Sequence, residues 1–203
     1  MKSYKQIVEK VNKGGQEKGK IEMSTAKLST AVKYGEKVFD LNEIPNFEDN
    51  FNFAKKQVKL GKTKRSEMPV ITSRDVDKFK EHLENGSMNT ILDLNFDVGK
   101  VNIKMKKVKA KSLIPIQRQL YFDKSMSGIA ENGISKTREF LKNKTYFITS
   151  SDSNIIDGHH RWLQALLIDP NMVVQIMQID MSIDKLLVVS KKFGSYIGNA
   201  KNK

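Results

Sequence analysis

Hydrophobic and polar positions change their spacing several times along residues 68–195. In residues 101–108 apolar side chains alternate with asparagine and lysine, which predicts a half-buried strand with Ile103 and Met105 turned to the core. Residues 76–83 instead repeat apolar side chains at helical spacing, and Asn85-Gly86 ends that predicted helix. The other predicted elements are strands at 69–71, 146–149, 155–156 and 173–179 and helices at 135–142, 159–168 and 183–192.

The first 65 residues have a weaker pattern. Short amphipathic helices are predicted at 3–12 and 24–34. Residues 38–53 hold Phe39, Phe47, Phe51 and Phe53, and this density of phenylalanine does not suit a free linker, so we expect docking onto the main domain or onto a protein partner. Residues 55–65 form a basic run without an apolar period, which indicates a linker or an arm that contacts a polyanion.

This order of elements predicts an α+β fold in which helices pack on a small mixed sheet. Residues 111–121 are predicted to be a strand end or a loop, because Pro115 cannot donate a hydrogen bond within a ladder. We assign the α+β domain to residues 66–203. Residues 1–65 are then a basic N-terminal extension, which is partly helical or wraps a partner.

Composition narrows the class of protein. No apolar run approaches the roughly 18 residues that a membrane-spanning helix needs, so no membrane partner is expected. The absence of cysteine excludes disulfide scaffolds, thiolate zinc sites and cysteine nucleophiles, and it fits a cytoplasmic protein. The lysine- and asparagine-rich composition and the small size would also suit a bacteriophage protein, in which case the location could be the virion.

Positive charge is concentrated in two blocks of the chain. The whole sequence has 36 Lys and Arg against 23 Asp and Glu. Residues 1–65 carry 15 basic and 8 acidic side chains, and residues 100–144 carry 12 and 3. Such blocks favour DNA or RNA as a partner, whereas a solvated lysine surface is the simpler alternative, since only five of the 36 are Arg. The lysines predicted to contact a nucleic-acid backbone are Lys104, Lys106, Lys109 and Lys111.

The clearest chemical motif is Asp157-Gly158-His159-His160-Arg161, which falls between a predicted strand and a predicted helix. Free N–H groups at a helix start attract an anion, and Gly158 permits a close approach of the backbone. Arg161 offers a planar fork for phosphate oxygens, and the two histidines can move protons near neutral pH. Asp157 can act as a base or as a ligand of Mg²⁺.

Each of these residues also has an ordinary structural explanation. A carboxylate near a helix start is a common cap, an Asp-Gly pair is a common turn, and paired histidines occur on surfaces. Five such residues together indicate a site more strongly than any one of them. A histidine-based metal centre is not expected, because adjacent side chains on a helix diverge by about 100° and no third histidine is near.

Residues 155–166 resemble the Asp-Gly-His-His-Arg motif of the ParB/sulfiredoxin superfamily, which includes nuclease-like partitioning domains, sulfiredoxin and free-serine kinases. The order of the upstream segments, with Ile114-Pro-Ile-Gln-Arg-Gln119 before a short helix and a hairpin, is similar as well. The resemblance covers roughly residues 68–195. It implies a small α+β domain that binds a nucleotide phosphate at the motif.

Carried over by position, the resemblance implies roles for particular residues. Gly158, His159, His160 and Arg161 would hold phosphates, Asp157 would stand where the kinases keep a catalytic acid, and Arg118 would face the same pocket. The motif lacks the sulfiredoxin cysteine, so reduction of a sulfinic acid through that residue is excluded. The Gly-Glu-Arg-Arg form and the helix-turn-helix of the partitioning proteins are absent too, which argues against clamping by cytidine triphosphate.

Three functions follow as hypotheses. The first is a phosphate-ester enzyme, a phosphotransferase or ATPase that uses ATP and Mg²⁺, with Asp157, His159 and His160 as catalytic residues. The second is a nuclease or nucleic-acid-binding protein that holds the backbone with its lysines. The third is a structural or interaction protein without catalysis.

Overall fold

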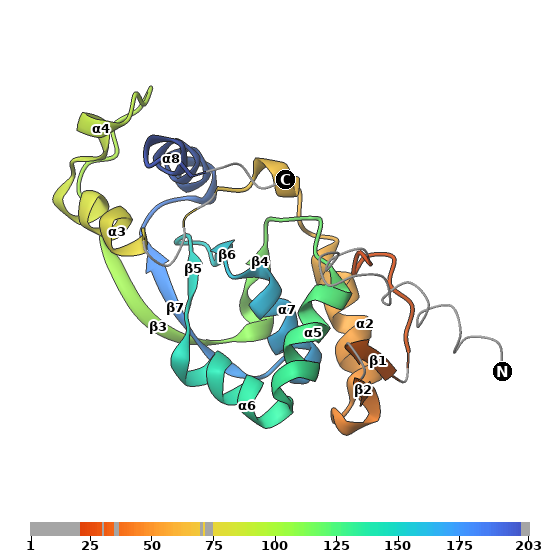
Figure 1. The fold of residues 1–203 in the computed structure, drawn as a ribbon. Coiled ribbons are helices and arrows are strands. Elements are labelled where there is room, and N and C mark those ends of the chain that lie inside the picture. Colours follow the sequence, from red (N-terminus) through yellow and green to blue (C-terminus); the bar gives the residue numbers. More distant parts are fainter. Residues whose placement is uncertain (1–20, 30, 35–36, 70, 72–74, 200–203) are drawn as a thin grey trace.

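A five-stranded mixed sheet forms the centre of the molecule (Figure 1). The computed structural model describes residues 21–29, 31–34, 37–69, 71 and 75–199. β3 and β7 are antiparallel, β7 and β5 parallel, β5 and β6 antiparallel, and β6 and β4 parallel. The strands, in their order across the sheet, are β3 (Ile103–Lys109), β7 (Val173–Ile179), β5 (Phe147–Thr149), β6 (Asn154–Asp157) and β4 (Ile114–Pro115). The predicted α+β class with a mixed sheet is therefore confirmed.

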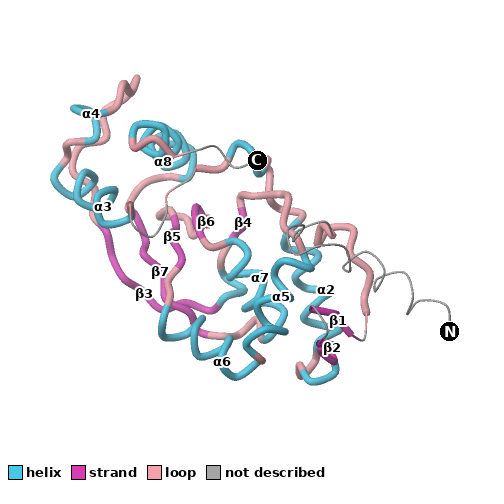
Figure 2. The backbone as a smooth tube through the Cα atoms, viewed as in Figure 1, coloured by secondary structure: helices cyan, strands magenta, loops and turns pink. Residues whose placement is uncertain are grey.

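Helices cover both faces of this sheet (Figure 2). Along β7, Val174 and Ile176 belong to one hydrophobic core, while Met177 and Ile179 belong to another on the opposite face. This explains why β7 is mostly apolar, interrupted only by Gln175 and Gln178, because a central strand is buried on both sides. The first core contains residues of α2 (Phe47–Val58), α5 (Phe122–Asn132) and α7 (His159–Ile168), and Ile134 of α6 (Ile134–Glu139) packs against it. The second core contains residues of α3 (Val76–Asn85), α4 (Met88–Ile91) and α8 (Ile183–Tyr196).

Shorter elements complete the described part of the chain. A two-stranded hairpin joins β1 and β2, and Val32 of the first strand lies opposite Phe39 of the second. The helix predicted at 24–34 is therefore wrong: Ser24 and Thr25 lie in a turn, residues 26–29 are irregular, and buried Val32 is placed by strand pairing. The helix predicted at 3–12 lies outside the described residues. The shorter elements are β1 (Ala31–Tyr34), β2 (Lys37–Asp40), the 3-10 turns η1 (Leu41–Glu43), η2 (Arg65–Glu67) and η3 (Ala110–Ser112), and the π-helical turn η4 (Phe140–Lys144).

The described part of residues 1–65 shares the core of the α+β domain. α2 packs along α7, and Phe51 is buried and meets the ring of Phe122 edge-on at 5.5 Å. The side-chain amide of Asn50 donates hydrogen bonds to the carbonyl oxygens of Leu167 and Ile168, 3.2 and 3.3 Å away. The phenylalanines of residues 38–53 thus dock onto the main domain.

Two details differ from the pattern-based expectation at the edges of the sheet. Met105 is 57% exposed rather than turned into the core, because β3 is an edge strand with a neighbour on one side only. Pro115 does sit in a ladder, since β4 is the other edge strand, where a missing N–H is tolerated. Among the described residues, no helix combines the length and the apolar character that crossing a membrane would require.

Candidate functional site

The motif lies where β6 ends at Asp157 and α7 begins at His159, as the sequence predicts. Gly158 between them has a φ of 101°, a left-handed conformation that favours glycine. A β-carbon at this position would lie 2.8 Å from a ring carbon of Phe147, so any larger residue would also clash. Among the residues that the structure describes, no side chain caps the start of α7, so the N–H groups of its first turn can meet an anion.

Arg161 folds back over this helix start. Its Nη2 lies 2.6 Å from Oδ2 of Asp157, and its Nη1 donates to the hydroxyl of Thr145 at 2.7 Å. The guanidinium also lies over the ring of Phe147, 5.9 Å from the centroid. Its Nη2 lies 3.2 Å from the position that a β-carbon on Gly158 would take. Both charged side chains remain partly exposed, at 33% and 47%, so a ligand can reach the pair.

His159 is buried and holds a neighbouring loop. Its Nε2 accepts hydrogen bonds from the backbone N–H groups of Ile116 and Gln117, at 3.3 and 3.2 Å. Burial, together with the nearby His160, lowers the pKa of His159 to about 3. The ring is therefore neutral with its proton on Nδ1, and it joins the motif to the end of β4.

His160 faces a different group of residues. Its Nε2 lies 3.3 Å from Nη1 of Arg65 and its Nδ1 lies 3.1 Å from the hydroxyl of Ser125, which in turn donates to the carbonyl oxygen of Tyr121. Arginine can only donate, so Nε2 accepts and Nδ1 carries the proton. Burial first, and then the positive charges of Lys124 and Arg65, lower the pKa of His160 to about 3.

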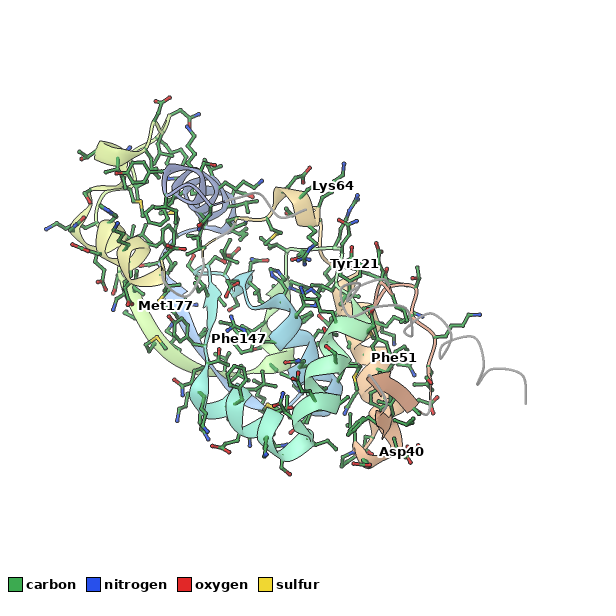
Figure 3. All side chains as sticks on the ribbon, in the orientation of Figure 1. Asp40, Phe51, Lys64, Tyr121, Phe147 and Met177 are labelled. Atoms are coloured by element: carbon green, nitrogen blue, oxygen red, sulfur yellow. The ribbon has the colours of Figure 1, made fainter. Side chains whose placement is uncertain are left out.

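Arg65 and Lys124 are cations that the sequence-based prediction of the site did not include. The guanidinium of Arg65 lies 6.0 Å from the ring centroid of Tyr121, and that ring stacks on His160 at 6.2 Å. Burial and the charge of Arg65 lower the pKa of the Lys124 ammonium. Figure 3 labels Lys64, next to Arg65, and Tyr121 in the same region of the molecule, with Phe147 on the far side of α7.

Backbone contacts fix the segment that carries Arg65. The N–H groups of Lys62 and Thr63 donate to the carbonyl oxygen of Ile116, and the N–H of Arg65 donates to the side chain of Gln119 at 3.1 Å. Gly61 lies so close to the backbone of residues 117–118 that no side chain would fit there. The basic run at 55–65 is thus the end of α2 followed by an ordered loop. The sequence signal for Arg65 was the positive charge of this run, which indicated contact with a polyanion but no particular residue.

Among the described residues, the side chains of the remaining predicted residues make no hydrogen bond or ion pair with this cluster. The side chain of Arg118 is exposed, and its backbone N–H donates to the carbonyl oxygen of Thr63. Lys104, Lys106, Lys109 and Lys111 are exposed on or just after β3, with the ammonium of Lys106 bonded to Gln178. Within the described residues, no three His, Asp or Glu side chains gather closely enough to hold a metal ion.

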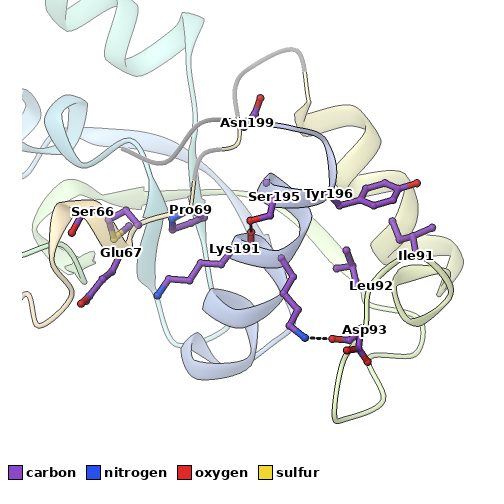
Figure 4. Close-up of a pocket in the computed structure, with 13 residues that line it drawn as sticks. Ser66, Glu67, Pro69, Ile91, Leu92, Asp93, Lys191, Ser195, Tyr196 and Asn199 are labelled. Carbon is purple, nitrogen blue, oxygen red and sulfur yellow. Dashed lines mark hydrogen bonds between the residues drawn. The ribbon is translucent and has the colours of Figure 1, made fainter. Parts of the chain in front are cut away.

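A separate pocket of about 660 Å³ opens between η2, α4 and α8 (Figure 4). Its walls include Glu67, Leu92, Lys191 and Tyr196, and the ammonium of Lys192 reaches the carbonyl oxygen of Asp93 at its rim. None of the residues that the sequence predicts for the site lines this pocket.

The structure by itself defines a mixed α+β protein with a polar motif at a strand-to-helix junction. Comparisons of the chain with protein-family models, with curated proteins and with solved structures give no match. The resemblance to the ParB/sulfiredoxin superfamily stays a prediction from the motif and from the order of the elements around it.

Proposed function

We propose that the protein binds the phosphate groups of a nucleotide at the start of α7 and acts on a phosphate ester or anhydride, as a phosphotransferase or ATPase. The observation that carries this proposal is the uncapped start of α7 behind Gly158, with the guanidinium of Arg161 held over it. Free N–H groups, the helix dipole and a planar cation favour the same ligand, an oxyanion.

The pair between Asp157 and Arg161 suggests how binding and chemistry are coupled. A phosphate would compete with the carboxylate for the guanidinium, and Asp157 would be released. The freed carboxylate would accept the proton of an attacking hydroxyl group or water. The acceptor oxygen would bond to phosphorus while the bond to the leaving phosphate oxygen breaks. We assign proton transfer to Asp157 rather than to His159, whose Nε2 is occupied by two backbone N–H groups.

Mg²⁺ fits this proposal only as an ion that arrives with the nucleotide. Asp157 is one oxygen ligand, and Mg²⁺ in such sites is often held by one or two carboxylates together with substrate phosphates and water. When bound, the ion would neutralise charge on the transferring phosphoryl group. The protein's own part is to bind phosphate with α7 and Arg161 and to place Asp157 beside it.

Isothermal titration with ATP, ADP and CTP, with and without Mg²⁺, tests the proposal. Arg161→Ala should weaken nucleotide binding by roughly 1.5–3 kcal/mol, the range for a hydrogen bond to a charged group. Arg138→Ala in α6 is the matched control and should bind as the wild type does. Equal affinity of the Arg161 variant and the wild type would refute this site.

A second candidate is binding of DNA or RNA along β3. The observation that favours it is the row of exposed lysines on this edge strand, with Lys104 and Lys106 on one face. Lysine side chains contact phosphates rather than base edges, so such binding would show little sequence preference. The two candidates differ in ligand and in place, which allows separate tests.

A further inference from the structure

Two positive charges meet beside His160 and come from different parts of the chain. Arg65 is contributed by η2, and Lys124 by the first turn of α5. Both side chains are half-buried. Within the part of the chain that the structure describes, neither has a carboxylate within 4 Å.

This arrangement costs free energy unless an anion compensates it. Partial burial disfavours each charged group, and the two like charges repel each other. The lowered pKa of Lys124 reflects both effects, with Asp123 offsetting part of them. His160 stays neutral between the two cations and so adds no charge of its own. Side chains arranged in this way are typical of sites that hold an anionic ligand.

The structure also presents Arg65 in a form suited to binding. One N–H group faces Nε2 of His160, and the guanidinium rests against the ring of Tyr121. Its other N–H groups have no hydrogen-bond partner among the described residues. The backbone bonds of residues 62, 63 and 65 hold the segment in place, so little order has to be gained on binding.

We infer that Arg65, with Lys124 beside it, binds a terminal phosphate group next to His160, so that the N-terminal segment supplies a binding residue from outside the motif. A terminal phosphate carries up to two negative charges, which match two cations better than the single charge of a phosphodiester. This inference rests on the proposed function. The phosphate can belong to a free nucleotide or to a phosphorylated nucleic-acid end.

The test uses the full chain and isothermal titration with pyrophosphate, ATP, adenosine and a short DNA strand with or without a 5′-phosphate. Arg65→Met keeps an unbranched side chain and removes the charge, and it should weaken pyrophosphate and ATP binding by roughly ten- to a hundredfold. Lys62→Met, an exposed lysine of the same loop, is the matched control and should change neither affinity. Circular dichroism and the melting temperature report folding. If Arg65→Met is unfolded, Lys124→Met takes its place.

The outcomes separate this inference from the proposed function. Wild-type affinity for ATP and pyrophosphate in a folded Arg65→Met variant would overturn the inference and leave nucleotide binding at α7 standing. A second outcome is that the protein binds pyrophosphate, or DNA only when it is 5′-phosphorylated, in a way that needs Arg65, but does not bind ATP. That result would support the inference and overturn the proposal that the protein binds a nucleotide. Binding of ATP that needs both Arg65 and Arg161 would support both.

Discussion

Three consecutive side chains at the start of α7 meet three different surroundings. His159 is buried against the end of β4, His160 faces Arg65 and Ser125, and Arg161 reaches back to Asp157. Successive residues of a helix point about 100° apart, so one turn can divide a motif between structural support and ligand contact. The sequence revealed the residue types but not this division, because it depends on loops that are remote in the chain.

Asp157→Asn should separate folding from chemistry. An exposed ion pair contributes about 0–1 kcal/mol, so the melting temperature should change by no more than about 2–4 °C. Nucleotide affinity should stay the same or increase, because Arg161 loses its competing carboxylate, whereas turnover should disappear. Thermal denaturation, titration with ATP and a phosphate-release assay measure these effects. Asp180→Asn, at an exposed position, is the control, and full turnover in the Asp157 variant would show that this residue is only a structural cap.

His160 should make stability depend on pH. Its pKa in the folded protein is lowered to about 3, from an ordinary value of 6.5, by burial and by Lys124 and Arg65, with Asp123 opposing them. The unfolded chain therefore binds more protons between these two values, and the free energy of unfolding should fall as the pH drops from about 6.5 towards 3. Urea unfolding at several pH values should show a shallower fall for His160→Gln. If the free energy of unfolding falls equally with pH in the variant and the wild type, the lowered pKa of His160 is contradicted.

Elements with local signals in the sequence were predicted well. The bounds of α7 and β7 agree with the prediction, since Gly158 and Asp169-Pro170 mark helix ends and a buried strand shows as an apolar run. α5 was missed although Phe122, Met126 and Ile129 recur at helical spacing, because its glycine and two serines weaken the pattern. The place of Arg65 could not be predicted, since it depends on backbone bonds to residues about 50 positions later.

The lysines of β3 test the nucleic-acid candidate at the level of one strand. Replacing Lys104 and Lys106 with Glu should weaken DNA or RNA binding several-fold and leave mononucleotide binding nearly unchanged, because these side chains lie on one exposed face. Fluorescence anisotropy at increasing salt measures the effect. A double variant of Lys78 and Lys136 to Glu carries the same change of charge elsewhere. If the wild type binds neither DNA nor RNA at low salt, the candidate fails.

At the scale of the whole molecule, the sheet separates two cores that depend on distant parts of the chain. One core joins α2 to α5 and α7, and the other joins α3 to α8. The boundary predicted at residue 65 does not divide the protein into separate cores, because the first core combines residues 23–58 with residues 110–176.

Phe51→Ala should therefore destabilise the whole protein. The ring is buried and touches Phe122, and removing such a side chain costs about 3–5 kcal/mol through lost burial and a cavity. Phe140→Ala, at a ring that is 40% exposed, should cost much less. Equilibrium urea unfolding compares the two. A loss below about 1 kcal/mol for the Phe51 variant would indicate that α2 is an independent extension.

The bonds from Asn50 to the end of α7 also bear on how the chain is made. These partners are 117 residues apart, and ribosomes add roughly 5–20 residues per second, so the interval between them is on the order of 6–23 s. During that time the phenylalanines of α2 emerge without the helix that covers them in the finished protein. Newly made chains should need protection from aggregation at this stage, and faster release of α7 should increase the yield of folded protein.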